Sequence, residues 1–153
     1  MSPHPYDRVV VALRAAFEES QKCGLEDAKL SKGVGEILLA HDLGHELVRG
    51  DKGADAFDPK TGERFEYKVS CTNQFNFNVG PRGSGPVALK IRRAFDGISG
   101  AYCARRRGSA IVRVEYCPAE SLIDDLVRHV GGRQSKQLQK VYSLDTFSIL
   151  APN

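Results

Sequence analysis

The stretch that most constrains the fold of this 153-residue chain is Gly53-Ala54-Asp55-Ala56-Phe57-Asp58-Pro59-Lys60-Thr61-Gly62-Glu63-Arg64-Phe65-Glu66-Tyr67-Lys68-Val69-Ser70. In residues 64–70 apolar and polar side chains alternate, which predicts a strand with one apolar and one polar face. Residues 54–58 form a second extended segment, and the residues between the two segments are typical of a turn. The pattern predicts a hairpin in which Asp55 lies against Glu66, with Lys68 two residues along on the same face.

The pattern D-x10-E-x-K has a chemical meaning, because two carboxylates placed in this way can share one hard cation. Magnesium suits such a site, since it takes a few carboxylates and fills its remaining positions with water and phosphate oxygen. The carbonyl of residue 67 or a neighbour would complete the shell. A lysine beside metal and phosphate can orient or deprotonate a water molecule and offset charge in the transition state. The alternative is an ordinary solvated strand face, on which acidic and basic residues often alternate.

Two helices are predicted ahead of the hairpin. Residues 6–21 carry apolar side chains at helical spacing, and the pattern stops at Cys23-Gly24. A second helix is expected to begin near Ser31 as its N-cap and to end at Gly44, with Glu36 in its middle. A short strand at residues 46–49 then leads into the hairpin.

More strands are predicted after the hairpin. Residues 72–78 continue the alternation, residues 80–86 form a loop rich in glycine and proline, and residues 88–95 are ambiguous between helix and strand. Residues 101–104 and 110–116 are expected to pair as strands around a basic tip.

The remaining residues complete the expected fold. Pro118 is expected to open a helix at its first turn. The tail, residues 134–150, suggests a short helix followed by a last strand at residues 146–150. The expected fold class is therefore α/β (α+β), with a central mixed β-sheet flanked by helices, in one domain over residues 1–153.

A helix with a central acidic residue, followed by this hairpin, further strands and a helix, resembles the PD-(D/E)xK nuclease superfamily. The closer resemblance is to the small homodimeric type II restriction endonucleases of the PvuII kind, which have a segment of the type G-x-D-A-x-D…G-x-x-x-E-x-K-S. Here Ser70 comes one place later than in that pattern, Ala54 replaces proline or asparagine, and Cys71 follows directly. The resemblance is specific around the hairpin and topological over the first 45 residues and the tail.

The resemblance implies a restriction-endonuclease-like core in which Asp55 and Glu66 bind Mg2+, with Mn2+ able to substitute, and Lys68 is the catalytic lysine. A helical acidic residue approaches the site in many members of the superfamily, which implies a catalytic role for Glu36. The alternative for Glu36 is a solvent-exposed position in mid-helix. The other nearby acidic residues are expected to lie in turns: Asp51, Asp58 and Glu63.

The resemblance also implies a function, that of a type II restriction enzyme making double-strand cuts in DNA at a short palindromic site. Cutting both strands of a palindrome calls for two symmetric sites, so a homodimer is expected, with residues 6–21 in its interface. One rival is a nuclease of the same fold that selects DNA structure or serves in a larger defence system. A rival from another class is a non-catalytic nucleic-acid-binding module, which would have no need of an acidic pair that repels phosphate.

Polar and basic residues after the hairpin are candidates for contacts to double-stranded DNA. Asparagine and glutamine can pair with adenine in the major groove, and arginine with guanine. The candidates for reading bases are Asn73, Gln74, Asn76, Asn78 and Arg82. The candidates for phosphate contacts, which position a protein without specifying sequence, are Lys90, Arg92, Arg93, Arg105, Arg106 and Arg107. The alternatives are a polar strand face beside buried phenylalanines, and solvated surface charges.

Composition limits the class of protein. The net charge of +3, from 22 basic and 19 acidic residues, permits a nucleic-acid partner without requiring one. The four cysteines form no CxxC pair, so free thiols in a reducing cytosol are expected. His41 and His45 have a spacing that could hold zinc on a helix, but they lack a third ligand, so no zinc site is expected. The longest apolar runs are far shorter than the roughly 20 residues that span a bilayer. A cytoplasmic protein without a membrane partner is therefore expected.

Overall fold

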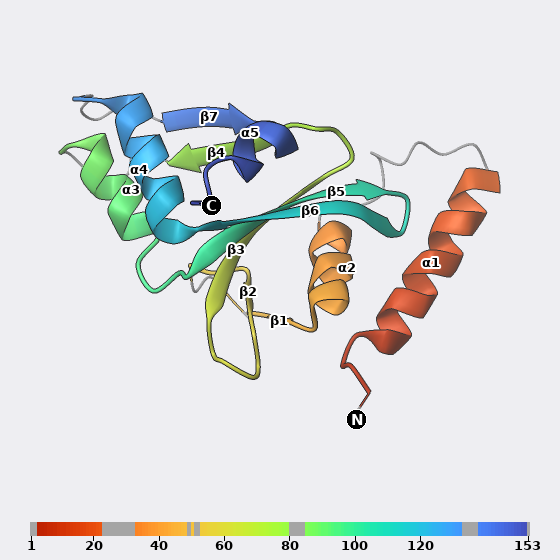
Figure 1. Cartoon of the computed structure of the whole chain (residues 1–153). Coiled ribbons are helices and arrows are strands. Elements are labelled where there is room, and N and C mark those ends of the chain that lie inside the picture. Colours follow the sequence, from red (N-terminus) through yellow and green to blue (C-terminus); the bar gives the residue numbers. More distant parts are fainter. Residues whose placement is uncertain are drawn as a thin grey trace.

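The structure, a computed structural model, describes residues 3–22, 33–48, 50, 53–79, 85–132 and 138–152. Its elements are α1 (Asp7–Lys22), α2 (Val34–Leu43), β1 (Glu46–Leu47), β2 (Ala56–Phe57), β3 (Arg64–Ser70), β4 (Phe75–Val79), α3 (Val87–Ala94), β5 (Gly100–Arg107), β6 (Ala110–Pro118), α4 (Ala119–Val130), β7 (Leu138–Tyr142) and α5 (Leu144–Ser148). Five strands form a central sheet in the order β1-β2-β3-β5-β6, and β4 pairs with β7 in a separate ribbon (Figure 1). The mixed α/β class is confirmed. None of the described helices is both long and apolar enough to cross a membrane.

Strand β3 occupies the centre of the main sheet. It runs antiparallel to β2 and parallel to β5, so the sheet is mixed, as expected. A parallel pair requires a crossover connection, which β4 and α3 supply between β3 and β5. In the register of β3 and β5, Glu66 pairs with Ala101 and Lys68 with Cys103. Glu66 and Lys68 therefore have small residues as their neighbours in β5.

The two faces of the sheet are covered by different elements. Phe65 and Tyr67 of β3 pack with Leu39 of α2 in one buried cluster. A larger cluster on the other face joins β4, α3, α4 and α5 to β5, and Figure 1 shows these elements on the side away from α2. Because side chains alternate along a strand, Glu66 and Lys68 point to this second face.

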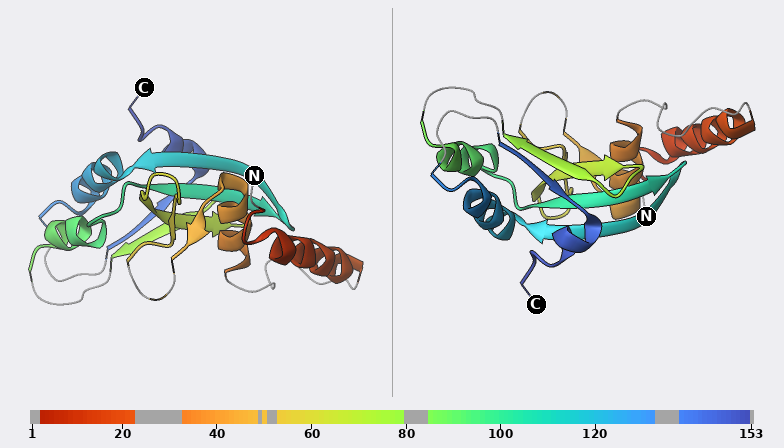
Figure 2. Two further views of the ribbon diagram at one scale, coloured as in Figure 1. Left: turned by 90° about the horizontal axis from the view of Figure 1, so that it is seen from below. Right: turned by 90° about the horizontal axis from the view of Figure 1, so that it is seen from above.

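Helix α1 projects from the body of the domain (Figure 2). Its apolar residues Val10 and Phe17 are buried against Leu38 of α2 and its neighbours. Val9 and Val11, in contrast, are 42% and 66% exposed. The bounds of α1 differ by one residue at each end from those that the sequence predicts.

Other predicted elements are present with adjusted bounds. Helix α2 ends at Gly44, whose φ of 71° is left-handed, as expected. It begins at Val34 with Gly33 as its N-cap, so the prediction of a cap at Ser31, which lies outside the described residues, is wrong. The ambiguous residues 88–95 fall mainly in helix α3, and the strand predicted at 46–49 is reduced to β1. Pro118 is the last residue of β6 and the N-cap of α4, so it stands just before the first turn.

The predicted order of elements in the tail is wrong. The sequence predicts a helix and then a strand at residues 146–150, whereas strand β7 precedes helix α5. Ser143 explains the difference: its Oγ accepts a hydrogen bond from Thr146 N at 3.1 Å, and its N donates to Thr146 Oγ1 at 2.8 Å. This capping box starts a helix at Leu144 and overrides the strand preference of the residues that follow.

Asp125 of α4 ties the β4–β7 ribbon to the rest of the domain. Its Oδ2 accepts hydrogen bonds from Lys140 Nζ and, at 2.6 Å, from Tyr142 Oη. Burial by itself would raise the pKa of the Asp125 carboxyl, but the hydrogen bonds from Lys140 and Tyr142 lower it overall. The ionised form of Asp125 therefore stabilises the position of β7 against α4.

Asp125→Asn is expected to lower the free energy of unfolding at neutral pH by about 2 kcal/mol, as for other hydrogen bonds to a charged group. Because the pKa of Asp125 is lowered by folding, its contribution is present above the ordinary value of 3.8 and is lost as the pH falls through the folded value. Urea unfolding of the wild type and of Asp125→Asn, at neutral pH and well below pH 3.8, measures the difference in free energy of unfolding between the two proteins. The exposed Asp124→Asn is the control, and a difference that is the same at both pH values would contradict the assignment.

Candidate active site

A tight turn closes the β2–β3 hairpin. The carbonyl of Asp58 accepts a hydrogen bond from Gly62 N at 2.8 Å, and Asp58 Oδ1 accepts one from Lys60 N at 2.8 Å. Gly62 has a φ of 77°, which glycine adopts without strain. The backbone hydrogen bond from Lys60 lowers the pKa of Asp58. Asp58 is therefore a turn residue, as expected.

The register of this hairpin brings Asp55 and Glu66 together. Ala56 pairs with Phe65, and Asp55 N donates to Phe65 O at 3.0 Å, so Asp55 stands opposite Glu66, as the sequence predicts. Asp55 Oδ2 accepts from Tyr67 N at 2.8 Å. The charge of Asp55 helps to raise the pKa of the Glu66 carboxyl, so the two carboxyl groups are close enough to repel each other. These two residues are called the acidic pair below.

Glu66 and Lys68 are half-buried rather than solvated. Their side chains are 22% and 29% exposed, and Lys68 Nζ forms an ion pair with Glu66 Oε1. Burial raises the pKa of the Glu66 carboxyl; Lys68 opposes the rise, and the charge of Asp55 adds to it. This degree of burial disfavours the alternative of an ordinary solvated strand face.

Helix α2 brings Glu36 into the same electrostatic environment. At Gly35 the helix lies so close to β3 that an added Cβ would meet Val69 Cγ1 at 2.6 Å. Burial raises the pKa of the Glu36 carboxyl, the charges of the acidic pair raise it further, and Lys68 opposes the rise. Glu36 lies in the first turn of α2 rather than in its middle, and it is half-buried rather than fully solvated.

The donor set can be compared with what a metal ion requires. The part of the chain that the structure describes contains no group of three or more histidine, cysteine, aspartate or glutamate side chains placed to hold a metal ion. Glu36 thus does not join the acidic pair as a third ligand in this arrangement. Two carboxylates nevertheless fit Mg2+, which proteins bind through one or two carboxylates while several waters remain on the ion.

A cavity of about 190 Å3 opens beside Glu66 and Lys68. Strand β4 and helices α3 and α4 supply its other walls through Phe77, Asn78, Ala94, Phe95 and Leu126. Since a water molecule occupies about 30 Å3 in the liquid, the cavity has room for several. The apolar wall residues were not predicted as part of the site, because they come from elements that meet only in the folded chain.

Strand β4 has one buried, aromatic face and one exposed, polar face. Phe75 and Phe77 are buried, while Asn76 and Asn78 are exposed. Asn78 lines the cavity together with Glu66. Asn78 therefore lies at the cavity of the candidate catalytic groups, whereas Asn76 is not among the residues that line it.

The other candidates for reading bases lie in different environments. Asn73 Oδ1 accepts a hydrogen bond from Leu144 N at 3.0 Å, so Asn73 holds the start of helix α5. Gln74 is exposed. Arg82 lies outside the described residues. The described candidates Asn73, Gln74, Asn76 and Asn78 are all exposed.

The candidates for phosphate contacts lie on two elements. Helix α3 carries Lys90, Arg92 and Arg93, of which the two arginines are exposed, and Arg92 lies 3.9 Å from an oxygen of Asp124. Arg105 and Arg107 are exposed at the end of β5. These positions remain compatible with contacts to a DNA backbone.

Arg106 differs from its two neighbours, because it is only 6% exposed. Side chains alternate along β5, so Arg106 lies on the same face as Ala104, the face that packs on α2. The guanidinium donates to Gly108 O at 2.6 Å and to Cys71 Sγ at 2.9 Å, and it lies 5.1 Å from the centre of the Phe17 ring. Arg106 therefore links the β5–β6 hairpin to α1 and to the end of β3, and the expectation that it contacts phosphate is corrected.

Tyr67, between Glu66 and Lys68, anchors β3 from the opposite face. Its Oη lies 2.8 Å from Nδ1 of the buried His45, whose ring stacks on Phe65 with 4.9 Å between the centroids. Burial lowers the pKa of His45, which favours the neutral imidazole that can accept a hydrogen bond from a phenol. The sequence analysis considered His45 only as a zinc ligand and missed this role.

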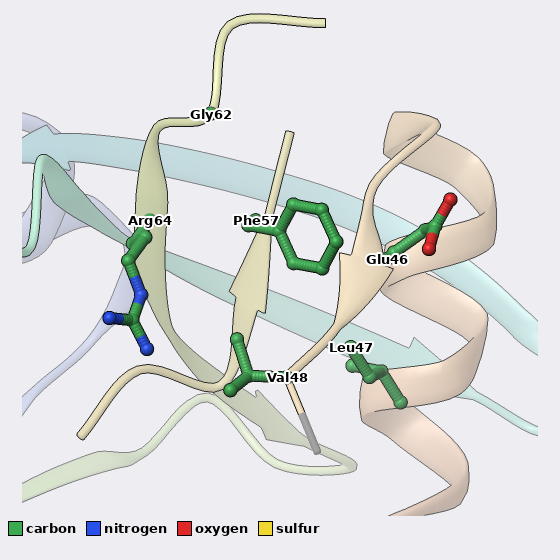
Figure 3. A pocket seen from close by; sticks show the side chains of 6 residues that line it. All are labelled: Glu46, Leu47, Val48, Phe57, Gly62 and Arg64. Atoms are coloured by element: carbon green, nitrogen blue, oxygen red, sulfur yellow. The ribbon is translucent and has the colours of Figure 1, made fainter. Parts of the chain in front are cut away.

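A second hollow, of about 500 Å3, lies on the outer part of the same hairpin (Figure 3). The side chains of Leu47, Val48 and Phe57 give it an apolar character, and Glu46 and Arg64 add charge. Its lining includes neither member of the acidic pair. The smaller cavity is therefore the one that belongs to the candidate site.

No protein-family model matches the chain, and no curated protein matches it significantly. The features of the described residues that bear on function are the acidic pair, Lys68 and the cavity beside them.

Proposed function

We propose that the chain is a magnesium-dependent endonuclease that hydrolyses DNA phosphodiester bonds on a restriction-endonuclease-like core. The observation that carries the proposal is the half-buried acidic pair on neighbouring strands, with Lys68 ion-paired to Glu66 at the wall of one cavity. A pair of carboxylates in this setting is electrostatically unfavourable, since burial and mutual charge raise the pKa of Glu66. A divalent cation relieves that repulsion.

Asp55 and Glu66 would hold the Mg2+ ion, and Mn2+ would substitute because it takes the same oxygen ligands. The ion supplies charge neutralisation at phosphorus and a bound water of lowered pKa. Lys68 orients the attacking water and offsets the charge that develops on the phosphate oxygens. Glu36 on helix α2 adds negative charge near the acidic pair, consistent with the rise in its pKa that the charges of Asp55 and Glu66 cause.

Double-stranded DNA is the proposed partner. The exposed residues Arg92 and Arg93 of α3 and Arg105 and Arg107 of β5 are available for its phosphates. The leading version is a cytoplasmic, homodimeric type II restriction enzyme that makes double-strand cuts at a short palindromic site. The alternatives are a structure-selective or defence-system nuclease of the same fold, and a non-catalytic nucleic-acid-binding module.

Purified protein incubated with supercoiled plasmid and Mg2+ is expected to give discrete bands on a gel, with Mn2+ as a substitute and no cleavage in EDTA. Glu66→Gln, which removes a proposed ligand, should be inactive, and Glu63→Gln in the exposed turn is the matched control. Smearing, or a preference for branched DNA, would support the structure-selective alternative. Binding without cleavage in Mg2+ and in Mn2+ would contradict the proposal and support the binding module.

A further inference from the structure

The ammonium group of Lys68 lies between two partners of different kinds. On one side Nζ forms the ion pair with Glu66 Oε1. On the other it lies 5.4 Å from the centroid of the Phe77 ring. Phe77 belongs to β4, is 3% exposed, and lines the same cavity as Glu66 and Lys68. An aromatic face attracts an ammonium ion within about 6 Å of its centroid, through the negative charge on the face of the ring.

The Phe77 ring is itself held in place by other aromatic rings. It stacks on Phe147 of α5 with 5.9 Å between centroids and an interplanar angle of 10°. It also meets Tyr142 of β7 edge to face, at 5.5 Å and 86°. Tyr142 is in turn hydrogen-bonded to Asp125 of α4. The ring that faces Lys68 therefore has an orientation fixed by β7, α4 and α5.

We propose that Phe77 is a positioning residue that holds the Lys68 ammonium group at the cavity, an inference that rests on the proposed function. A lysine side chain has four rotatable bonds, and a single ion pair restricts it weakly. When a cation draws charge from the Glu66 carboxylate, the attraction between Glu66 and Lys68 weakens. The contact with the Phe77 ring does not depend on that carboxylate, so it keeps Lys68 beside the acidic pair when metal is bound.

Phe147 offers a matched control for Phe77. Both residues are buried in the same cluster and stack on each other, so replacing either with leucine removes one ring from the stack. Among the described residues, the ring over which Lys68 Nζ lies is that of Phe77. Phe77→Leu and Phe147→Leu should therefore have similar effects on stability and different effects on Lys68. Phe77→Tyr keeps the aromatic face and should therefore retain the contact with Lys68.

The contact can be measured without any cleavage reaction. In protein labelled with 13C-lysine, the Hε protons of Lys68, identified by their absence in Lys68→Arg, are expected to shift upfield because of the Phe77 ring current. The upfield shift should disappear in Phe77→Leu and persist in Phe147→Leu and Phe77→Tyr. A Lys68 resonance at the position of an exposed lysine in the wild type would overturn the inference.

The consequence for catalysis is measured with Mg2+ and a cleavable DNA. Phe77→Leu is expected to lower kcat about tenfold with KM unchanged, in line with the loss of one cation–π contact at the reacting lysine. Phe77→Tyr should restore kcat, and Phe147→Leu should retain it. Equal losses in Phe77→Leu and Phe147→Leu would overturn the role of Phe77 alone. A wild type that shows the upfield shift and cleaves no DNA would overturn the proposed function instead.

Discussion

Lys68→Ala is expected to reduce DNA cleavage about a thousandfold, within the range for a group that both moves a proton and stabilises transition-state charge. The loss should appear in kcat, because Lys68 acts on the water and on the reacting phosphate. Affinity for DNA should change little, since the exposed arginines of α3 and β5 supply the proposed backbone contacts. Single-turnover cleavage and gel-shift titration with the same DNA measure the two effects separately.

Lys60→Ala is the matched control for this experiment. Lys60 is an exposed lysine at the tip of the same hairpin, so its loss changes the net charge equally. It should leave both cleavage and binding unchanged. Cleavage by Lys68→Ala at a rate close to that of the wild type would remove Lys68 from the proposed mechanism.

Gly35→Ala is expected to destabilise the fold by about 2 kcal/mol, the size typical of overpacking a filled interior. The added Cβ would lie 2.6 Å from Cγ1 and 2.9 Å from Cβ of Val69. In a helix with free space the same change would stabilise by up to about 1 kcal/mol, because alanine is the better helix former. The sign of the change thus tests whether α2 touches β3. Because the clash pushes α2 away from β3, Glu36 should also leave the environment of the acidic pair.

Urea unfolding and cleavage assays of Gly35→Ala measure these two effects. Gly132→Ala is the control, because an added Cβ there meets nothing within 4 Å. The double variant Gly35→Ala with Val69→Ala should recover part of the lost stability, since it removes Cγ1, the nearer of the two clashing atoms, and leaves Cβ. A Gly35→Ala protein as stable as the wild type would show that the close approach of α2 to β3 is absent.

The hairpin could be predicted from the sequence because its determinants are local. The turn between Asp58 and Gly62 and the alternation in residues 64–70 suffice to place Asp55 opposite Glu66. Helices α1 and α2 could likewise be placed from the spacing of apolar residues and from the glycine that ends α2. In each case the interactions that decide the conformation lie within a few residues of one another.

The surroundings of the acidic pair could not be predicted because they depend on contacts between distant segments. Strand β4 pairs with β7 rather than extending the main sheet, and this pairing places Phe77 over Lys68. The burial of Arg106 depends on its contacts with Phe17 and Cys71, which lie far from it in the sequence. In the tail, a two-residue capping box at Ser143 outweighs the strand preference of the residues after it.

The pairing of β4 with β7 also bears on when the proposed enzyme becomes competent during its synthesis. The strands span residues 75–79 and 138–142, so β4 leaves the ribosome well before its partner does. Until β7 is made, the wall of the cavity that carries Phe77 and Asn78 lacks the strand that supports it. A nascent chain therefore has the acidic pair and Lys68 before it has a complete cavity. For an enzyme that cuts DNA, this order delays activity until translation has passed β7.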